Sequence, residues 1–186
     1  MTGPDEGILT LEPLIEAVRQ AVETAGWELS GLQKTTSHQF EGRWQGDSTR
    51  SAYLFFHLPD GPDHVSVDVY LDETSRGLTG NLALVVDLVP LGDIGDVRDA
   101  LESLATPSAL YVHERHRRPV TVRLRLADAA EPLDEAGIEV RFKVRLGKAT
   151  VAAGAEPVSD FTAEVLESFQ KVLASEQLER FVSHDR

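Results

Sequence analysis

Two segments with the alternation of β-strands place basic side chains at every second position. Residues 120–126 read Val-Thr-Val-Arg-Leu-Arg-Leu, and residues 138–146 read Ile-Glu-Val-Arg-Phe-Lys-Val-Arg-Leu. Successive side chains of a strand point to opposite faces. One face of this pair is therefore apolar, and the other carries five cations that could bind carboxylates or phosphates: Arg123, Arg125, Arg141, Lys143 and Arg145.

The basic face stands out because the chain as a whole is acidic. The 186 residues carry a formal net charge of −13, yet 9 of the 18 basic residues fall between Arg115 and Lys148. An acidic protein lacks the broad positive field on which general nucleic-acid binding depends. The clustering still leaves local binding of an anionic partner open.

Aromatic residues are expected on the same face of the sheet. Tyr53 and Phe55 alternate with the apolar residues of segment 50–58, and Tyr70 alternates with the valines of segment 64–71. We expect all three side chains to point away from the core. Exposed aromatic side chains beside a row of arginines form a mixed apolar and cationic patch, which is typical of an interaction site.

The basic face has three interpretations. Its cations could be solvated or paired with acids on a neighbouring strand. They could form a protein-docking or dimerisation surface, where arginine is enriched. They could also line a groove for single-stranded nucleic acid, with Tyr53, Phe55 and Tyr70 stacking on bases.

No catalytic, metal or cofactor motif accompanies this face. The chain has no cysteine and no GxSxG elbow, and residues 113–116 (HERH) lack the spacing of an HExxH site. Residues 92–96 (GDIGD) lack the later ligands of an EF-hand and the GK[ST] of a P-loop. We therefore predict a protein that is not an enzyme, with no metal, no cofactor and no catalytic residues.

Hydrophobic periodicity predicts the order of the elements. A helix over residues 9–26 precedes four strands, and a second helix begins near Asp93 and is limited by Pro107. A short strand over 110–113 precedes the basic pair, and a small-residue linker over 149–157 leads to a last helix over 158–182 with Ser159 as its N-cap. The four strands are predicted at 36–46, 50–58, 64–71 and 79–90.

Strands that follow one another without alternating helices indicate an α+β fold with an antiparallel β-sheet and flanking helices. The expected order is α-β-β-β-(β)-α-β-β-α. We expect a single domain over residues 1–186, with a core over about 9–182 and with helices on one face of the sheet only. The linker makes the last helix the element expected to move or to reach a partner subunit.

The layout resembles the YbjN-like family, which shares its fold with the type III secretion chaperones. The resemblance rests on the order of elements, on a first helix that ends in Gly26-Trp27, and on residues 88–93 (LVPLGD) before the second helix. It implies a type III secretion chaperone-like fold and a small acidic protein, commonly a homodimer, that binds another protein. It implies no catalytic residues.

Together these features predict a chaperone-like or adaptor protein that binds a protein partner. Single-stranded nucleic-acid binding by the same face is the alternative. Residues 1–10 lack a signal-peptide pattern and no apolar stretch is long enough to cross a membrane, so we expect a cytoplasmic protein. The expected partner-binding residues are Tyr53, Phe55, Tyr70, Arg123, Arg125, Arg141, Lys143 and Arg145.

Overall fold

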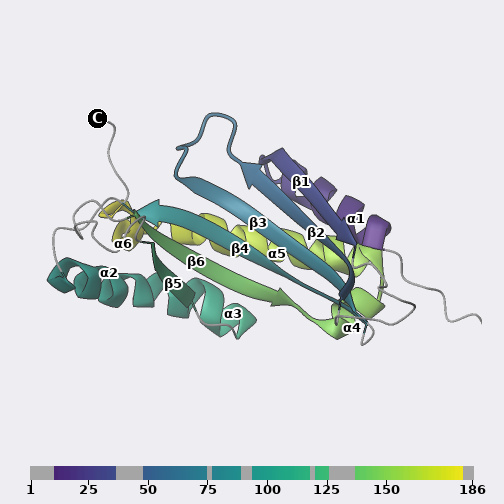
Figure 1. Ribbon diagram of the computed structural model, residues 1–186. Coiled ribbons are helices and arrows are strands. Elements are labelled where there is room, and N and C mark those ends of the chain that lie inside the picture. The colour runs from purple at the N-terminus through teal and green to yellow at the C-terminus, as the bar shows by residue number, and fades with distance from the viewer. Residues whose placement is uncertain are drawn as a thin grey trace, which may run out of the picture.

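The computed structural model describes residues 11–36, 48–74, 77–88, 94–117, 120–125 and 137–181. These residues form an α+β fold, as the sequence predicts, with helices flanking an antiparallel sheet (Figure 1). In chain order the elements are α1 (Leu11–Thr24), β1 (Glu28–Thr36), β2 (Ser48–His57), β3 (Val65–Thr74), β4 (Gly77–Leu88), α2 (Ile94–Pro107), η1 (Ser108–His113), α3 (Glu114–His116), β5 (Val120–Arg125), β6 (Gly137–Leu146), α4 (Lys148–Ala152), α5 (Ala155–Leu173) and α6 (Glu176–Glu179).

The six strands form one open sheet in the order β1-β2-β3-β4-β6-β5. Every neighbouring pair is antiparallel, so β1 to β4 form a meander and β6 then lies against β4. The basic pair of the sequence is the β5–β6 pair, with Val120 opposite Phe142. Strands β1 and β5 are the two edges of the sheet.

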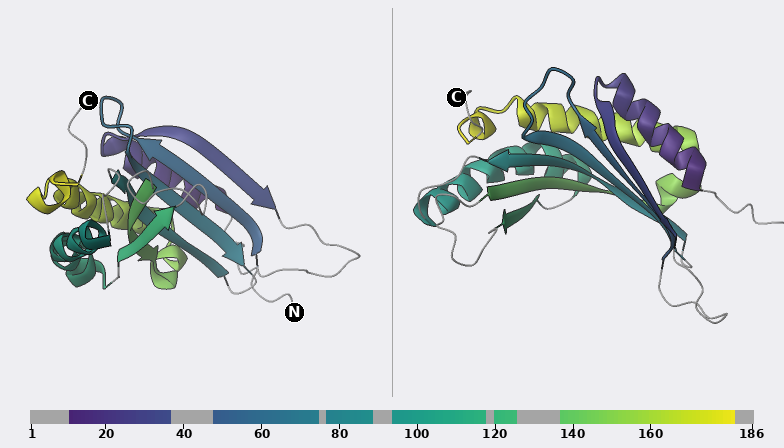
Figure 2. Two further views of the ribbon diagram at one scale, coloured as in Figure 1. Left: turned by 60° about the vertical axis from the view of Figure 1, so that its left-hand side comes forward. Right: turned by 45° about the horizontal axis from the view of Figure 1, so that its top comes forward.

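Helices α1 and α5 lie side by side over one face of the sheet (Figure 2). Their apolar stripes meet the inward-facing side chains of the central strands, because alternate residues of those strands are apolar. Leu54, Val67, Leu84 and Phe142 are all inaccessible to solvent in this layer. The core therefore fills the space between the two helices and the sheet.

The segment α2–η1–α3 extends this helical layer toward the β5 edge. Leu104 of α2 and Val112 of η1 are buried in the main core. Val120 and Val122 of β5 face the same segment, since they line a groove with residues of α2 and η1. The apolar face of the basic strand pair thus points to the helical side, as the alternation predicts.

The first strand differs from the prediction. A strand was expected over 36–46, whereas β1 covers Glu28–Thr36 and residues 37–47 lie outside the described part. Leu29 pairs with Phe56 and Leu32 pairs with Leu54, so the strand follows α1 almost directly. Its polar residues Gln33 and Lys34 are tolerated because an edge strand is covered on fewer sides.

The strand expected at residues 110–113 is wrong. These residues belong to η1, a π-helix over Ser108–His113 that continues from α2 and leads into α3. Pro107 does not end the helical course: it lies at the last position of α2, and the chain stays helical to His116. Arg117 then ends it in a left-handed conformation, with φ of 55°.

The predicted linker and last helix also need correction. Residues 148–152 form α4, whose Val151 is buried, and α5 already begins at Ala155 after Gly154, which has φ of 108°. Ser159 therefore lies inside α5 and is not its N-cap. Most of the expected linker is therefore helical, and α5 packs on α1 and on the sheet.

Candidate functional site

The face of the sheet opposite α1 and α5 carries the candidate site. Strand register places Tyr53, Tyr70, Asn81 and Arg145 in one row across β2, β3, β4 and β6. The next row contains Phe55, Asp68, Ala83 and Lys143. These rows border a shallow hollow of about 320 Å³, here called the sheet-face hollow, whose described lining residues all come from strands: Tyr53, Phe55, Asp68, Val69, Tyr70, Asn81, Ala83, Arg141 and Lys143.

Aromatic side chains form one wall of the sheet-face hollow. The rings of Tyr53 and Tyr70 pack at a centroid distance of 4.7 Å with a tilt of 39°. Tyr53 is 36% exposed and Phe55 is 38% exposed, as the sequence predicts for side chains on this face. Gly31 lies opposite Phe55 on β1, where an added Cβ would come within 3.4 Å of the ring. The edge strand thus leaves the Phe55 ring uncovered.

Arg141 is not available as a free cation. Its guanidinium lies 3.0 Å from an Asp68 carboxylate oxygen, and its Nε donates to Glu139 at 2.6 Å. Glu139 is buried and Asp68 is largely shielded. Burial raises the pKa of Asp68, while the charge of Arg141 opposes part of that rise. For this residue the first interpretation of the basic face holds: neighbouring acids neutralise it within one chain.

Lys143 and Arg145 differ from Arg141. Both side chains are exposed on β6, and neither makes an ion pair with another residue of the described part of the chain. Register places Arg145 in the row of Tyr53 and Tyr70, and Lys143 in the row of Phe55. The sheet-face hollow therefore combines an aromatic wall with one accessible cation in its lining, Lys143, and Arg145 lies two positions further along β6 on the same face.

Arg123 and Arg125 lie away from the aromatic residues. They belong to the edge strand β5 and stand opposite Glu139 and Gly137 of β6. Glu139 and Arg145 are six positions apart on β6, a distance of about 20 Å along a strand. Arg123 is exposed, and the side chain of Arg125 lies outside the described part. The predicted patch is therefore divided into the sheet-face hollow and the β5 edge.

Sequence reasoning missed the acids that hold Arg141. Asp68 was visible as a polar residue between Val67 and Val69, but its partner depends on the strand order β3-β4-β6. The intervening residue of β4 opposite Asp68 is Ala83, and its small side chain lets the carboxylate and the guanidinium meet across that strand. The contact between Asp68 and Arg141 can be inferred only once β6 is known to lie beside β4, although the two strands are not consecutive in the chain.

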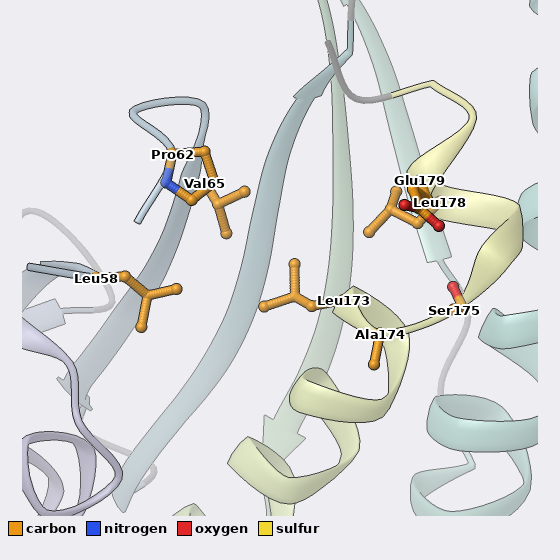
Figure 3. A pocket seen from close by; sticks show the side chains of 8 residues that line it. All are labelled: Leu58, Pro62, Val65, Leu173, Ala174, Ser175, Leu178 and Glu179. Carbon is orange, nitrogen blue, oxygen red and sulfur yellow. The ribbon is translucent and has the colours of Figure 1, made fainter. Parts of the chain in front are cut away.

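A larger hollow of about 470 Å³ lies at one end of the helical layer (Figure 3). Leu58 and Pro62 reach it from the β2–β3 connection and Val65 from the start of β3. Leu173 and Leu178 reach it from α5 and α6. Its walls are mainly aliphatic. The Ser175 hydroxyl at its rim donates to the carbonyl of Val172, so it is already satisfied. Among the described residues that line this larger hollow, Glu179 is the only charged one, and none is basic.

Residues 113–116, whose two histidines lack the spacing of an HExxH site, are helical. The His116 Nε2 lies 2.9 Å from the hydroxyl of Ser168, and its ring meets the edge of Phe161. Ser168 is fully buried, so this pair anchors α3 to α5 and offers no accessible nucleophile. The described residues contain no group of three potential metal ligands. None of the described helices is both long enough and apolar enough to span a membrane.

The chain matches no protein-family model, no curated protein and no solved structure. The resemblance to the YbjN-like family therefore stays a prediction, and function must be argued from the site geometry.

Proposed function

We propose that this protein is a non-enzymatic adaptor or chaperone-like protein that binds a segment of a partner protein in the sheet-face hollow. One observation carries the proposal: the exposed rings of Tyr53 and Phe55, with Tyr70 packed on Tyr53, line the same hollow as the accessible cation Lys143. Arg145 lies two positions further along β6 on that face. Aromatic residues and arginine are enriched at protein interfaces, and tyrosine and arginine are prominent among the residues that dominate the binding energy.

The chemistry of the hollow favours a partner segment with both apolar and acidic residues. Burial of apolar side chains against Phe55 and the tyrosine rings would supply most of the affinity. Lys143 and Arg145 would favour acidic partners and speed the encounter. Arg141 acts differently, because its ion pairs with Asp68 and Glu139 fix the floor of the hollow.

The proposal includes a homodimer in the cytoplasm, as the family resemblance and the sequence imply. Sedimentation equilibrium at micromolar concentration tests the dimer directly. A monomer at every concentration would remove the dimer from the proposal and leave the binding site unchanged.

Single-stranded nucleic acid fits this face less well. Asp68 and Glu139 lie on the same face as the cations and would oppose a phosphate backbone. Arg141, which they neutralise, is lost to phosphate binding. The remaining exposed cations are spread from Arg145 to the β5 edge and do not form one continuous track.

The test is isolation of the tagged protein from the cells that express it, after nuclease treatment. We expect a near-stoichiometric protein partner that is lost in the double variant K143E/R145E. The matched control is R98E/K171E, which makes the same change of charge at exposed cations on α2 and α5. The control should retain the partner.

Two outcomes would contradict the proposal. Equal loss of the partner in both double variants would mean that net charge, and not the hollow, controls binding. Co-purified nucleic acid that disappears with nuclease, with no protein left behind, would favour the nucleic-acid alternative. A steep loss of that binding with added salt would strengthen this second result.

A further inference from the structure

The outer edge of β5 offers a regular template for another strand. Among the described residues no strand pairs with this edge, and its ladder with β6 runs from Val120 to Arg125 without a register shift. The opposite edge, β1, is interrupted by a bulge between Leu29 and Gly31. Bulges protect an edge against pairing, whereas a regular ladder leaves N–H and C=O groups in register for an added strand.

An apolar groove of about 310 Å³ runs beside the β5 edge on the helical side. Val120 and Val122 form its strand wall, and Leu101 and Leu104 of α2 contribute to the opposite wall. Leu101 is 43% exposed, so the groove is open to solvent. A strand added to β5 would direct every second side chain toward this groove, because side chains alternate between the two faces.

The other face of β5 is basic. Arg123 is exposed there, and Arg125 shares its parity on the strand. The remaining side chains of an added strand would lie beside Arg123, where acidic residues are favoured. A second copy of this chain, pairing through the same edge, would bring two rows of arginine together, which is unfavourable.

We propose that the β5 edge binds an extended segment of a partner protein in which apolar and acidic residues alternate, as a seventh strand of the sheet. Its apolar side chains occupy the groove between β5 and α2, and its acidic side chains lie beside Arg123. Main-chain hydrogen bonds to β5 set the register, as in other cases of strand addition. This site is separate from the sheet-face hollow and does not depend on it.

The test uses a fluorescent, end-capped octapeptide in which Glu alternates with Val and Leu, titrated with the full chain and followed by anisotropy. Two controls are a peptide with Lys in place of each Glu and a peptide of the same composition with its apolar residues grouped. We expect only the alternating acidic peptide to bind. Hydrogen–deuterium exchange should then show new protection over residues 120–125.

Variants on the two walls locate the peptide. L101E should weaken binding about tenfold, because it places a charge in the groove, whereas L110E should not. Leu110 is 50% exposed but does not line the groove. R123E should weaken binding about fivefold, and R98E on α2 should leave it unchanged.

Binding that survives L101E and R123E but is lost in K143E/R145E would overturn the inference and place the peptide in the sheet-face hollow. No binding of the alternating peptide, or binding without protection of β5, would also overturn it. The proposal for the sheet-face hollow is tested separately. It fails if the K143E/R145E variant retains the partner protein.

Discussion

The two faces of strands β2, β3, β4 and β6 differ in what their side chains do. On the helical face Leu54, Leu84 and Phe142 are sealed under α1 and α5. On the opposite face, the neighbouring residues Phe55 and Lys143 of the same strands are exposed. Consecutive residues of one strand therefore lie in different physical environments: one side chain is buried in the core, and the next is accessible to solvent.

The open face also contains residues that are not available for binding, and Arg141 is the clearest case. Arg141 lies on the open face, yet it is held by Asp68 and Glu139 in the manner of an interior residue. The open face thus contains a structural ion-pair network beside side chains that are free to bind. Four predictions test this division, in order of decreasing effect on the free energy of unfolding.

The largest effect is expected for Phe142→Ala on the helical face. Removing a fully buried ring leaves a cavity in the core, which costs about 3–5 kcal/mol. Phe55→Ala on the open face should cost less than about 1 kcal/mol, because this ring is 38% exposed. Urea unfolding of both variants measures the difference. Equal losses would mean that the two faces do not differ in the way described.

Arg141→Met should destabilise the fold by about 2 kcal/mol. The substitution removes the guanidinium that pairs with the shielded carboxylates of Asp68 and Glu139, although partial exposure of Arg141 reduces the cost. Lys143→Met, two positions along the same strand, should change stability by less than about 0.5 kcal/mol. The midpoints of urea unfolding measure the stability of both variants. A large loss of stability in Lys143→Met would show that Lys143 is structural as well.

His116 gives the α3–α5 contact a dependence on pH. Burial, with a smaller effect of Arg115, lowers the pKa of His116 below its ordinary value near 6.5. The contribution of His116 to the free energy of unfolding is therefore complete above about pH 6.5. It decreases as pH falls below that value, because the unfolded chain binds the proton more readily than the folded chain. The free energy of unfolding should decrease less between pH 8 and pH 5.5 in His116→Gln than in the unchanged protein. An identical loss would exclude His116 as the cause.

The smallest effect is expected for the ion pair between Lys34 of β1 and Glu12 of α1, which are 2.8 Å apart. Both side chains are well exposed, so solvent weakens their attraction. A double-mutant cycle with alanine at both positions should give a coupling below about 0.5 kcal/mol. A larger coupling would show that the edge strand depends on this pair for its attachment to the helical layer.

Local patterns in the sequence predicted the fold class, the alternation of the basic strands and the exposure of Tyr53 and Phe55. These features depend on strand periodicity, which is visible over a few residues. The start of β1 was missed because its residues carry little apolar alternation and its position depends on pairing with β2. The π-helix at Ser108–His113 was missed because β-branched and aromatic residues there suggested a strand.

The candidate site was only partly predictable for a different reason. The sequence indicates which residues share a face, but it does not indicate how far apart they lie on a sheet. Arg123 and Arg145 have the same parity, and register nevertheless places them at different ends of β6. The neutralisation of Arg141 depends equally on strand order, since Asp68 is 73 positions earlier in the chain.

The packing of α1 against α5 has a consequence for synthesis of the chain. Residues 11–24 and 155–173 come from opposite ends of the sequence, and each covers part of the apolar surface of the same sheet. Until α5 has left the ribosome, that surface stays exposed in the nascent polypeptide. Contacts of such long sequence separation slow folding and favour aggregation of incomplete chains. The protein can therefore complete its native core only after α5 has been translated.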